Sequence, residues 1–172
     1  PIMWILMIMI LYGITTSLML RLPPLFRTRL LSEKLRSVKI IAHRGSKSEG
    51  IPENTIAAFE SAITAGAHQL ELDVWLTSDG HVVVFHDSDC TRMCGVDCTK
   101  ISETRLSDLP AIQPPPDQSE HFNPSDPRCT AIPTLEKVLE AIPDDMPLTI
   151  EFKQNCGALI AKVLGCLKKH NR

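Results

Sequence analysis

The N-terminal end of the sequence lacks charge. No charged side chain occurs within residues 2–20, and no Lys or Arg precedes Arg21. A cleaved signal peptide carries a basic leading region, so this absence disfavours that class of segment. A helix over this stretch would be about 28 Å long, close to the thickness of the hydrocarbon core of a bilayer. We therefore expect one transmembrane helix over residues 1–20.

Other absences narrow the class of protein. Aromatic residues make up only 5% of the chain, and no basic cluster is interleaved with them. This composition argues against nucleic acid as a partner. The six cysteines form no CxxC pair, so they support a zinc site only weakly. We expect free thiols, and disulfides only if the domain were luminal.

Residues 21–37 form a predicted linker that is rich in Arg and Pro. Basic residues directly after an apolar segment favour the cytoplasmic side of a membrane. They also favour anionic lipid headgroups. We therefore expect an intracellular membrane location, a cytoplasmic domain after the linker, and membrane lipid as a partner.

The remaining sequence alternates predicted strands with predicted helices, which is typical of a parallel α/β sheet. The expected strands, short and mostly apolar, are 38–42, 69–75, 82–86 and 148–152. The expected helices, with apolar residues on one face, are 54–65, 134–142 and 158–169. A stretch rich in proline at 111–128 is expected to be irregular.

The connection between the second and third strands, residues 76–81, is short. A hairpin is the obvious alternative, but an extended chain is long enough for a parallel return without a helix. An antiparallel third strand would carry His86 and Asp87 to the end opposite Glu71 and Asp73. We therefore expect the parallel return.

Three acidic residues have the spacing of a metal site. Glu71 and Asp73 lie two positions apart on a strand, so their side chains share a face. Two like charges in an interior are costly unless a cation neutralises them. Glu151 on the last strand would complete an oxygen ligand set for Mg²⁺ or Ca²⁺.

Two histidines also fall at the ends of strands. His43 and His86 are suited to removing a proton from an attacking oxygen and protonating a leaving alkoxide. Arg44 and Lys153 would balance the charge on a reacting phosphate. Asp87 either orients the His86 ring or begins the next turn, and the sequence leaves both readings open.

Short motifs follow one another along the chain, namely HRG at 43–45, PENT at 52–55, ELDV at 71–74, TSDG at 77–80, VVFHD at 83–87, IPTL at 132–135 and EFK at 151–153. The order of these motifs resembles the glycerophosphodiester phosphodiesterase family. The resemblance implies the roles just given for the histidines, acids and cations. It adds His86 as a further candidate metal ligand and Glu53 and Asn54 as supporting residues, whose main role we expect to be helix capping.

The resemblance implies the N-terminal half of a TIM (β/α)₈ barrel over residues 38–172, with its first four strands and an insertion at about 88–131. A complete barrel takes about 200 to 250 residues, so we expect a longer protein. The apolar N-terminus is similar to the membrane-bound, lysophospholipase D-like branch, which implies a phosphoric diester hydrolase acting on glycerophosphodiesters or lysophospholipids. The alternative is a catalytically silent, membrane-anchored fragment or relative with a binding role.

Overall fold

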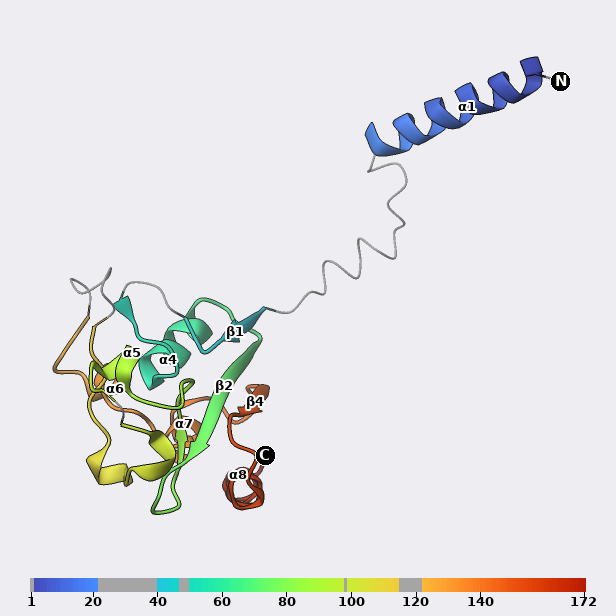
Figure 1. The fold of residues 1–172 in the computed structure, drawn as a ribbon. Helices are drawn as coiled ribbons and strands as arrows, with labels where there is room; N and C mark the ends of the chain where they lie inside the picture. The colour runs from blue at the N-terminus through green and yellow to red at the C-terminus, as the bar shows by residue number, and fades with distance from the viewer. Residues whose placement is uncertain (1, 22–39, 47–49, 98, 115–121) are drawn as a thin grey trace. The chain divides into compact units, whose positions relative to one another are not determined.

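The computed structural model describes residues 2–21, 40–46, 50–97, 99–114 and 122–172 (Figure 1). The chain divides into two compact units, residues 1–38 and 39–172. Helix α1 (Ile2–Arg21) belongs to the first unit, and every other described element belongs to the second. The linker predicted at 21–37 lies outside the described residues, apart from Arg21.

Helix α1 forms over the apolar stretch. Within it the hydroxyls of Thr15 and Thr16 donate hydrogen bonds to the carbonyl of Tyr12, at 2.9 and 2.8 Å. Large side chains such as Met3 and Trp4 are exposed. Among the helices of the described residues, none combines the length and the apolarity needed to cross a bilayer. The transmembrane helix predicted over residues 1–20 is therefore not confirmed.

The described part of the second unit contains one four-stranded sheet. Its strands are β1 (Ile41–His43), β2 (Gln69–Leu76), β3 (Val82–Val84) and β4 (Leu148–Phe152). The central strand β2 pairs in parallel with β1 and, on its other edge, with β4 (Figure 1). Strand β3 pairs antiparallel with β2 beyond the end of β1.

The parallel return predicted across residues 76–81 is wrong, because β2 and β3 form a hairpin. The Thr77 hydroxyl holds the turn by accepting from the backbone N–H of His81 at 2.9 Å and lying 2.6 Å from the Asp79 carboxylate. Among the described strands, only β1, β2 and β4 run parallel to one another. The prediction of four parallel strands in this segment is corrected accordingly.

His86 nevertheless reaches the end of the sheet where Asp73 lies. Strand β2 continues past Asp73 as far as Leu76, and the short β3 runs back along it. At the end of this return the backbone N–H of Phe85 donates to the carbonyl of Asp73 at 3.0 Å. The residue after Phe85 is therefore level with Asp73, although the strand before it is antiparallel.

Three helices cover the sheet and enclose the main core. They are α4 (Ile56–Thr64), α7 (Leu135–Ala141) and α8 (Gly157–Lys169), close to the predicted helices. Thr55 and Thr134 cap α4 and α7 by accepting hydrogen bonds from backbone N–H groups in the first turn. The apolar faces of these helices pack on one face of β2. The side chains of β2 in this core are Leu70, Leu72 and Val74.

The predicted insertion at about 88–131 contains short elements packed beneath the hairpin. They are α5 (Thr91–Cys94), η2 (Ile101–Glu103), η3 (Leu106–Asp108) and α6 (Pro127–Thr130). Side chains alternate along a strand, so Val82 and Val84 enter the main core while Val83 and Phe85 pack in a second cluster with the insertion. The cysteines of the described residues form no disulfide with one another.

Candidate active site

The three predicted acids meet at one end of the sheet. Glu71 and Asp73 lie on the face of β2 opposite its core leucines, and both are buried. Glu151 on β4 is the register partner of Asp73. Carboxylate oxygens from the three residues all lie within 4.8 Å of one another. The three carboxylates that the alternation of side chains predicted to share a face thus lie close together.

Asp73 is fully buried and surrounded by donors. Its Oδ2 lies 3.2 Å from Arg44 Nε and accepts a hydrogen bond from Asn54 Nδ2 at 2.8 Å. Its Oδ1 lies 3.0 Å from Lys153 Nζ, but within the described residues this oxygen has no hydrogen bond of good geometry. A buried carboxylate oxygen with unused acceptor capacity, next to two further carboxylates, fits a hard divalent cation such as Mg²⁺ or Ca²⁺.

Lys153 connects two of the acids. Its ammonium also lies 2.6 Å from Glu151 Oε1. This hydrogen bond holds the pKa of Glu151 below its usual value, and the charges of Lys153, His86 and Arg44 act in the same direction. Lys153, predicted to contact phosphate, lies against carboxylates that would hold a metal.

The HRG segment forms a sharp turn after β1. Arg44 has φ +60° and Gly45 has φ +81°. A Cβ at Gly45 would lie 2.7 Å from Ala58 in α4, so a glycine is required there. The turn directs the Arg44 backbone N–H to Glu71 Oε2 at 3.0 Å and leaves His43 Nε2 3.9 Å from the same oxygen.

The expectation that Glu53 and Asn54 mainly cap a helix is wrong. Thr55 is the N-cap of α4, and its hydroxyl accepts from the Ala58 N–H at 3.2 Å. Asn54, at φ +57°, turns its buried carboxamide toward Asp73. Glu53 accepts a hydrogen bond from Arg44 Nη1 at 3.0 Å. Both side chains therefore support the charged groups at the end of the sheet.

His86 is held by its neighbours. Its Nδ1 lies 2.6 Å from Asp87 Oδ1, so Asp87 contacts the ring. The indole Nε1–H of Trp75 donates to the His86 carbonyl at 3.3 Å. Of the two readings that the sequence left open for Asp87, the structure supports the one in which it orients the ring.

Sequence reasoning missed Arg92 and Trp75. Arg92 lies in α5 and pairs with both Glu53 and Asp87. Trp75 ends the expected strand 69–75 without a charged or titratable group, and no periodic pattern surrounds Arg92 in the insertion. The one available signal was the proximity of Arg92 to Asp87 along the chain.

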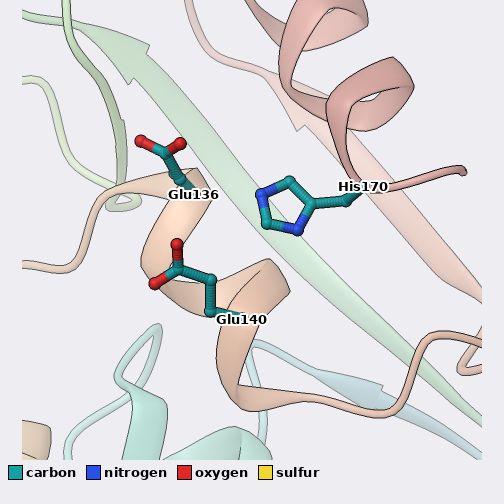
Figure 2. Close-up of side chains that lie close together, drawn as sticks. All are labelled: Glu136, Glu140 and His170. Carbon is teal, nitrogen blue, oxygen red and sulfur yellow. The ribbon is translucent and has the colours of Figure 1, made fainter.

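A second group of metal-ligating side chains lies on the outer helices (Figure 2). Glu136 and Glu140 lie on α7, and the ring of His170, which follows α8, points toward this helix (Figure 2). The Lys169 ammonium binds Glu136, and this hydrogen bond lowers the pKa of that carboxyl. Glu140 is exposed and Glu136 is paired with Lys169, whereas Glu71 and Asp73 are both buried. The acids on β2 and β4 are therefore the candidate metal centre.

Carboxylates, histidines and cations gathered at the strand ends of an α/β unit are the arrangement found in the active sites of α/β barrels. The chain belongs to the glycerophosphoryl diester phosphodiesterase family, whose model matches residues 43–164. It is 37% identical over 162 residues to lysophospholipase D GDPD1 of Homo sapiens, covering 94% of this chain and 50% of that protein. It is 36% identical over 136 residues to a glycerophosphodiester phosphodiesterase of Caldanaerobacter subterraneus, covering 77% of this chain and 53% of that protein.

Solved structures share the fold. A phosphodiesterase of Oleispira antarctica, in complex with the product sn-glycerol-3-phosphate, superposes with a TM-score of 0.65 at 33% identity, covering 77% of this chain and 53% of that one. A glycerophosphodiester phosphodiesterase of Thermotoga maritima has a TM-score of 0.59 at 36% identity, with 77% and 50% covered. The predicted barrel-type α/β fold is thus confirmed at the level of the family, and the chain spans about half the length of the relatives it matches.

Proposed function

We propose that the protein containing this sequence hydrolyses glycerophosphodiesters or lysophospholipids with a divalent cation held by Glu71, Asp73 and Glu151. The observation that carries the proposal is the convergence of these three carboxylates at the end of the sheet. Mg²⁺ and Ca²⁺ are the proposed cations, because both prefer carboxylate oxygens. Relatives named lysophospholipase D and glycerophosphodiester phosphodiesterase support the substrate class.

Hydrolysis forms a bond from phosphorus to a water oxygen and breaks the bond to an alkoxide. One group must take a proton from the water, and another must give a proton to the alkoxide. His43 and His86 are proposed for these roles, with Asp87 fixing the His86 ring through their 2.6 Å contact. Arg44 and Lys153 are proposed to bind the phosphate oxygens. A bound divalent cation would polarise a phosphoryl oxygen as a Lewis acid.

The proposed location is a membrane, with the domain on the cytoplasmic side. The uncharged stretch at 2–20 and the basic residues after it support this proposal. Sedimentation with vesicles containing anionic lipid, compared between the full chain and a chain lacking residues 1–21, tests the lipid association. Equal sedimentation of both chains would contradict a role for the N-terminal helix.

The test of function is hydrolysis of glycerophosphocholine and lysophosphatidylcholine by the purified chain, with added Mg²⁺ or Ca²⁺ and with EDTA. We expect product only with a divalent cation, and a loss of kcat of at least about 100-fold in His43→Ala and His86→Ala. His81→Ala is the matched control, since this exposed histidine lies on the hairpin turn. Full activity in EDTA would contradict the metal site, and an inactive chain would favour the silent alternative.

A further inference from the structure

Arg92 bridges two acids that belong to different parts of the chain. Its Nη2 lies 2.6 Å from Glu53 Oε1, and its Nε lies 2.6 Å from Asp87 Oδ2. Glu53 precedes α4, whereas Asp87 follows the hairpin. One guanidinium therefore ties the loop before α4 to the segment after β3. Its separate N–H groups suit this bridge, because a guanidinium presents donors in a fixed planar fork.

Each bridged acid holds a residue of the proposed active site. Glu53 accepts from Arg44 Nη1 at 3.0 Å, and Asp87 contacts His86 Nδ1 at 2.6 Å. The contacts form a continuous chain from Arg44 through Glu53, Arg92 and Asp87 to His86. Arg92 stands at its centre without being part of the acid cluster.

The backbone around Arg92 is anchored by burial. Cys90 and Cys94, on either side of it, are buried in the second apolar cluster. Gly95 ends α5 at φ +68°, and its N–H donates to the Thr91 carbonyl. The guanidinium therefore projects from a fixed turn of helix.

Burial works to raise the pKa of Asp87, but hydrogen bonds from Arg92 and His86 outweigh it and hold this pKa below its usual value.

Exposed ion pairs contribute little to protein stability in general. The Arg92 bridge is therefore compared with a second arginine bridge in the same chain. Arg128 also bridges two acids, at 2.9 Å from Glu60 and 2.8 Å from Asp126, and its side chain is 56% exposed against 50% for Arg92. Burial of the acids does not separate the two bridges, because Glu53 is less exposed than Glu60, at 8% against 39%, but Asp87 is more exposed than Asp126, at 23% against 15%. Only the acids bridged by Arg92 contact residues of the proposed site.

We propose that Arg92 is a positioning residue for phosphodiester hydrolysis, which holds Arg44 through Glu53 and His86 through Asp87. The proposal rests on the proposed function, because Arg44 and His86 have their roles there. It explains why an arginine in an inserted helix contacts both the segment before α4 and the segment after β3. Arg92 itself touches neither Glu71, Asp73 nor Glu151 among its contacts in the described residues.

The experiment compares Arg92→Ala, Arg92→Lys and the control Arg128→Ala in the full chain. We expect Arg92→Ala to lower kcat by about 10- to 100-fold, the scale for losing a side chain that orients a site residue by hydrogen bonding, with a smaller change in KM. Arg92→Lys should recover only part of this loss, because one ammonium replaces two donor positions. Added guanidinium should raise the rate of Arg92→Ala and leave Arg128→Ala unchanged. Equal kcat in the two alanine variants would overturn the proposal.

Hydrogen exchange of the same proteins separates this proposal from the proposed function. Arg92→Ala should speed amide exchange in residues 50–55 and 86–91, whereas Arg128→Ala should not. Unchanged exchange in these two segments would refute the structural bridge, whether or not the chain is active. If the unmutated chain is inactive but Arg92→Ala exchanges faster, the bridge exists and the proposed function is wrong. In that case the catalytic role of Arg92 is wrong as well.

Discussion

Replacement of Asp73 by Asn tests the burial of the acid cluster. The substitution keeps the shape of the side chain and removes its charge. Asp73 is 0% exposed and lies 3.2 Å from Arg44 Nε and 3.0 Å from Lys153 Nζ. Removing one partner of a buried ion pair costs about 3 to 5 kcal/mol, because the other charge is left uncompensated. Arg44 and Lys153 retain Glu53 and Glu151 as partners, so we expect about 3 kcal/mol.

Glu151→Gln is the matched control, since it makes the same chemical change in the same cluster. The Glu151 side chain is 54% exposed, so water screens its ion pair with Lys153. We expect this variant to lose no more than about 1 kcal/mol of the free energy of unfolding. The measurement is urea unfolding of the full chain followed by circular dichroism. Equal losses in the two variants would refute the assignment of Asp73 as the buried centre.

Calorimetric titration of the same two variants with Ca²⁺ or Mg²⁺ gives a second readout. Each variant loses one anionic ligand, so both should bind the cation more weakly, by about 10-fold or more. The two variants should therefore differ in stability but not in the direction of their cation affinity. Asp73→Asn is expected to lose both stability and cation affinity, and Glu151→Gln mainly cation affinity. Unaltered cation affinity in both variants would mean that the trio does not hold the metal.

Three further outcomes are expected. Gly45→Ala should lower the melting temperature, because its Cβ would lie 2.7 Å from Ala58 at a φ of +81°, and an unchanged melting temperature would contradict the packing. Lys153→Met should tighten Ca²⁺ binding by about 10-fold while slowing hydrolysis, since an ammonium beside the carboxylates is removed. Weaker Ca²⁺ binding in this variant would contradict the inference that the ammonium and the cation compete for the same carboxylate oxygens. The lowered pKa of Asp87 means that its ion pairs stabilise the fold above its unfolded pKa of 3.8 and are lost as the pH falls through the lower folded value. Asp87→Asn should therefore flatten the loss of stability in urea titrations below about pH 4.

Strands and helices with clear periodicity could be predicted from the sequence. The alternation of leucines with Glu71 and Asp73 gave β2 and its acidic face, because side chains alternate across a strand. The apolar face of α8 predicted the bounds of that helix to within one residue. The acid cluster followed from the same parity, with Glu151 on a second strand.

The direction of β3 could not be predicted, because the sequence does not show how far each strand extends. Strand β3 has three residues and β2 has eight, so an antiparallel β3 ends level with Asp73 rather than at the far edge. The position of His86 was therefore compatible with either direction. A functional residue at the end of a strand indicates where that end lies in the sheet, but it does not indicate whether the strand is parallel or antiparallel.

The role of Asn54 was underestimated for a related reason. Asn is common before helices as a cap, and sequence alone does not show burial. The backbone of Asn54 is left-handed, a conformation that Asn adopts more readily than most residues. That conformation sends the side chain to Asp73 and leaves the cap to Thr55.

The charges at the site imply that cation and phosphate binding support each other. Lys153 and Arg44 both neutralise Asp73, so a phosphate must compete with that carboxylate for them. A divalent ion at the carboxylates would take over the neutralisation and leave both side chains available. The two ligands should then bind with positive coupling, which by linkage is equal in both directions.

The last prediction is measured by titrating Ca²⁺ into the chain with and without inorganic phosphate, below the concentration at which the salt precipitates. We expect about 5-fold tighter Ca²⁺ binding with phosphate present, at the lower end of typical coupling between sites. The Lys153→Met variant should bind Ca²⁺ more tightly at the outset and show less coupling, because the competing ammonium is absent from both states. Coupling that persists undiminished in Lys153→Met would show that Lys153 does not exchange between Asp73 and the phosphate, and Arg44 would remain as the residue that does.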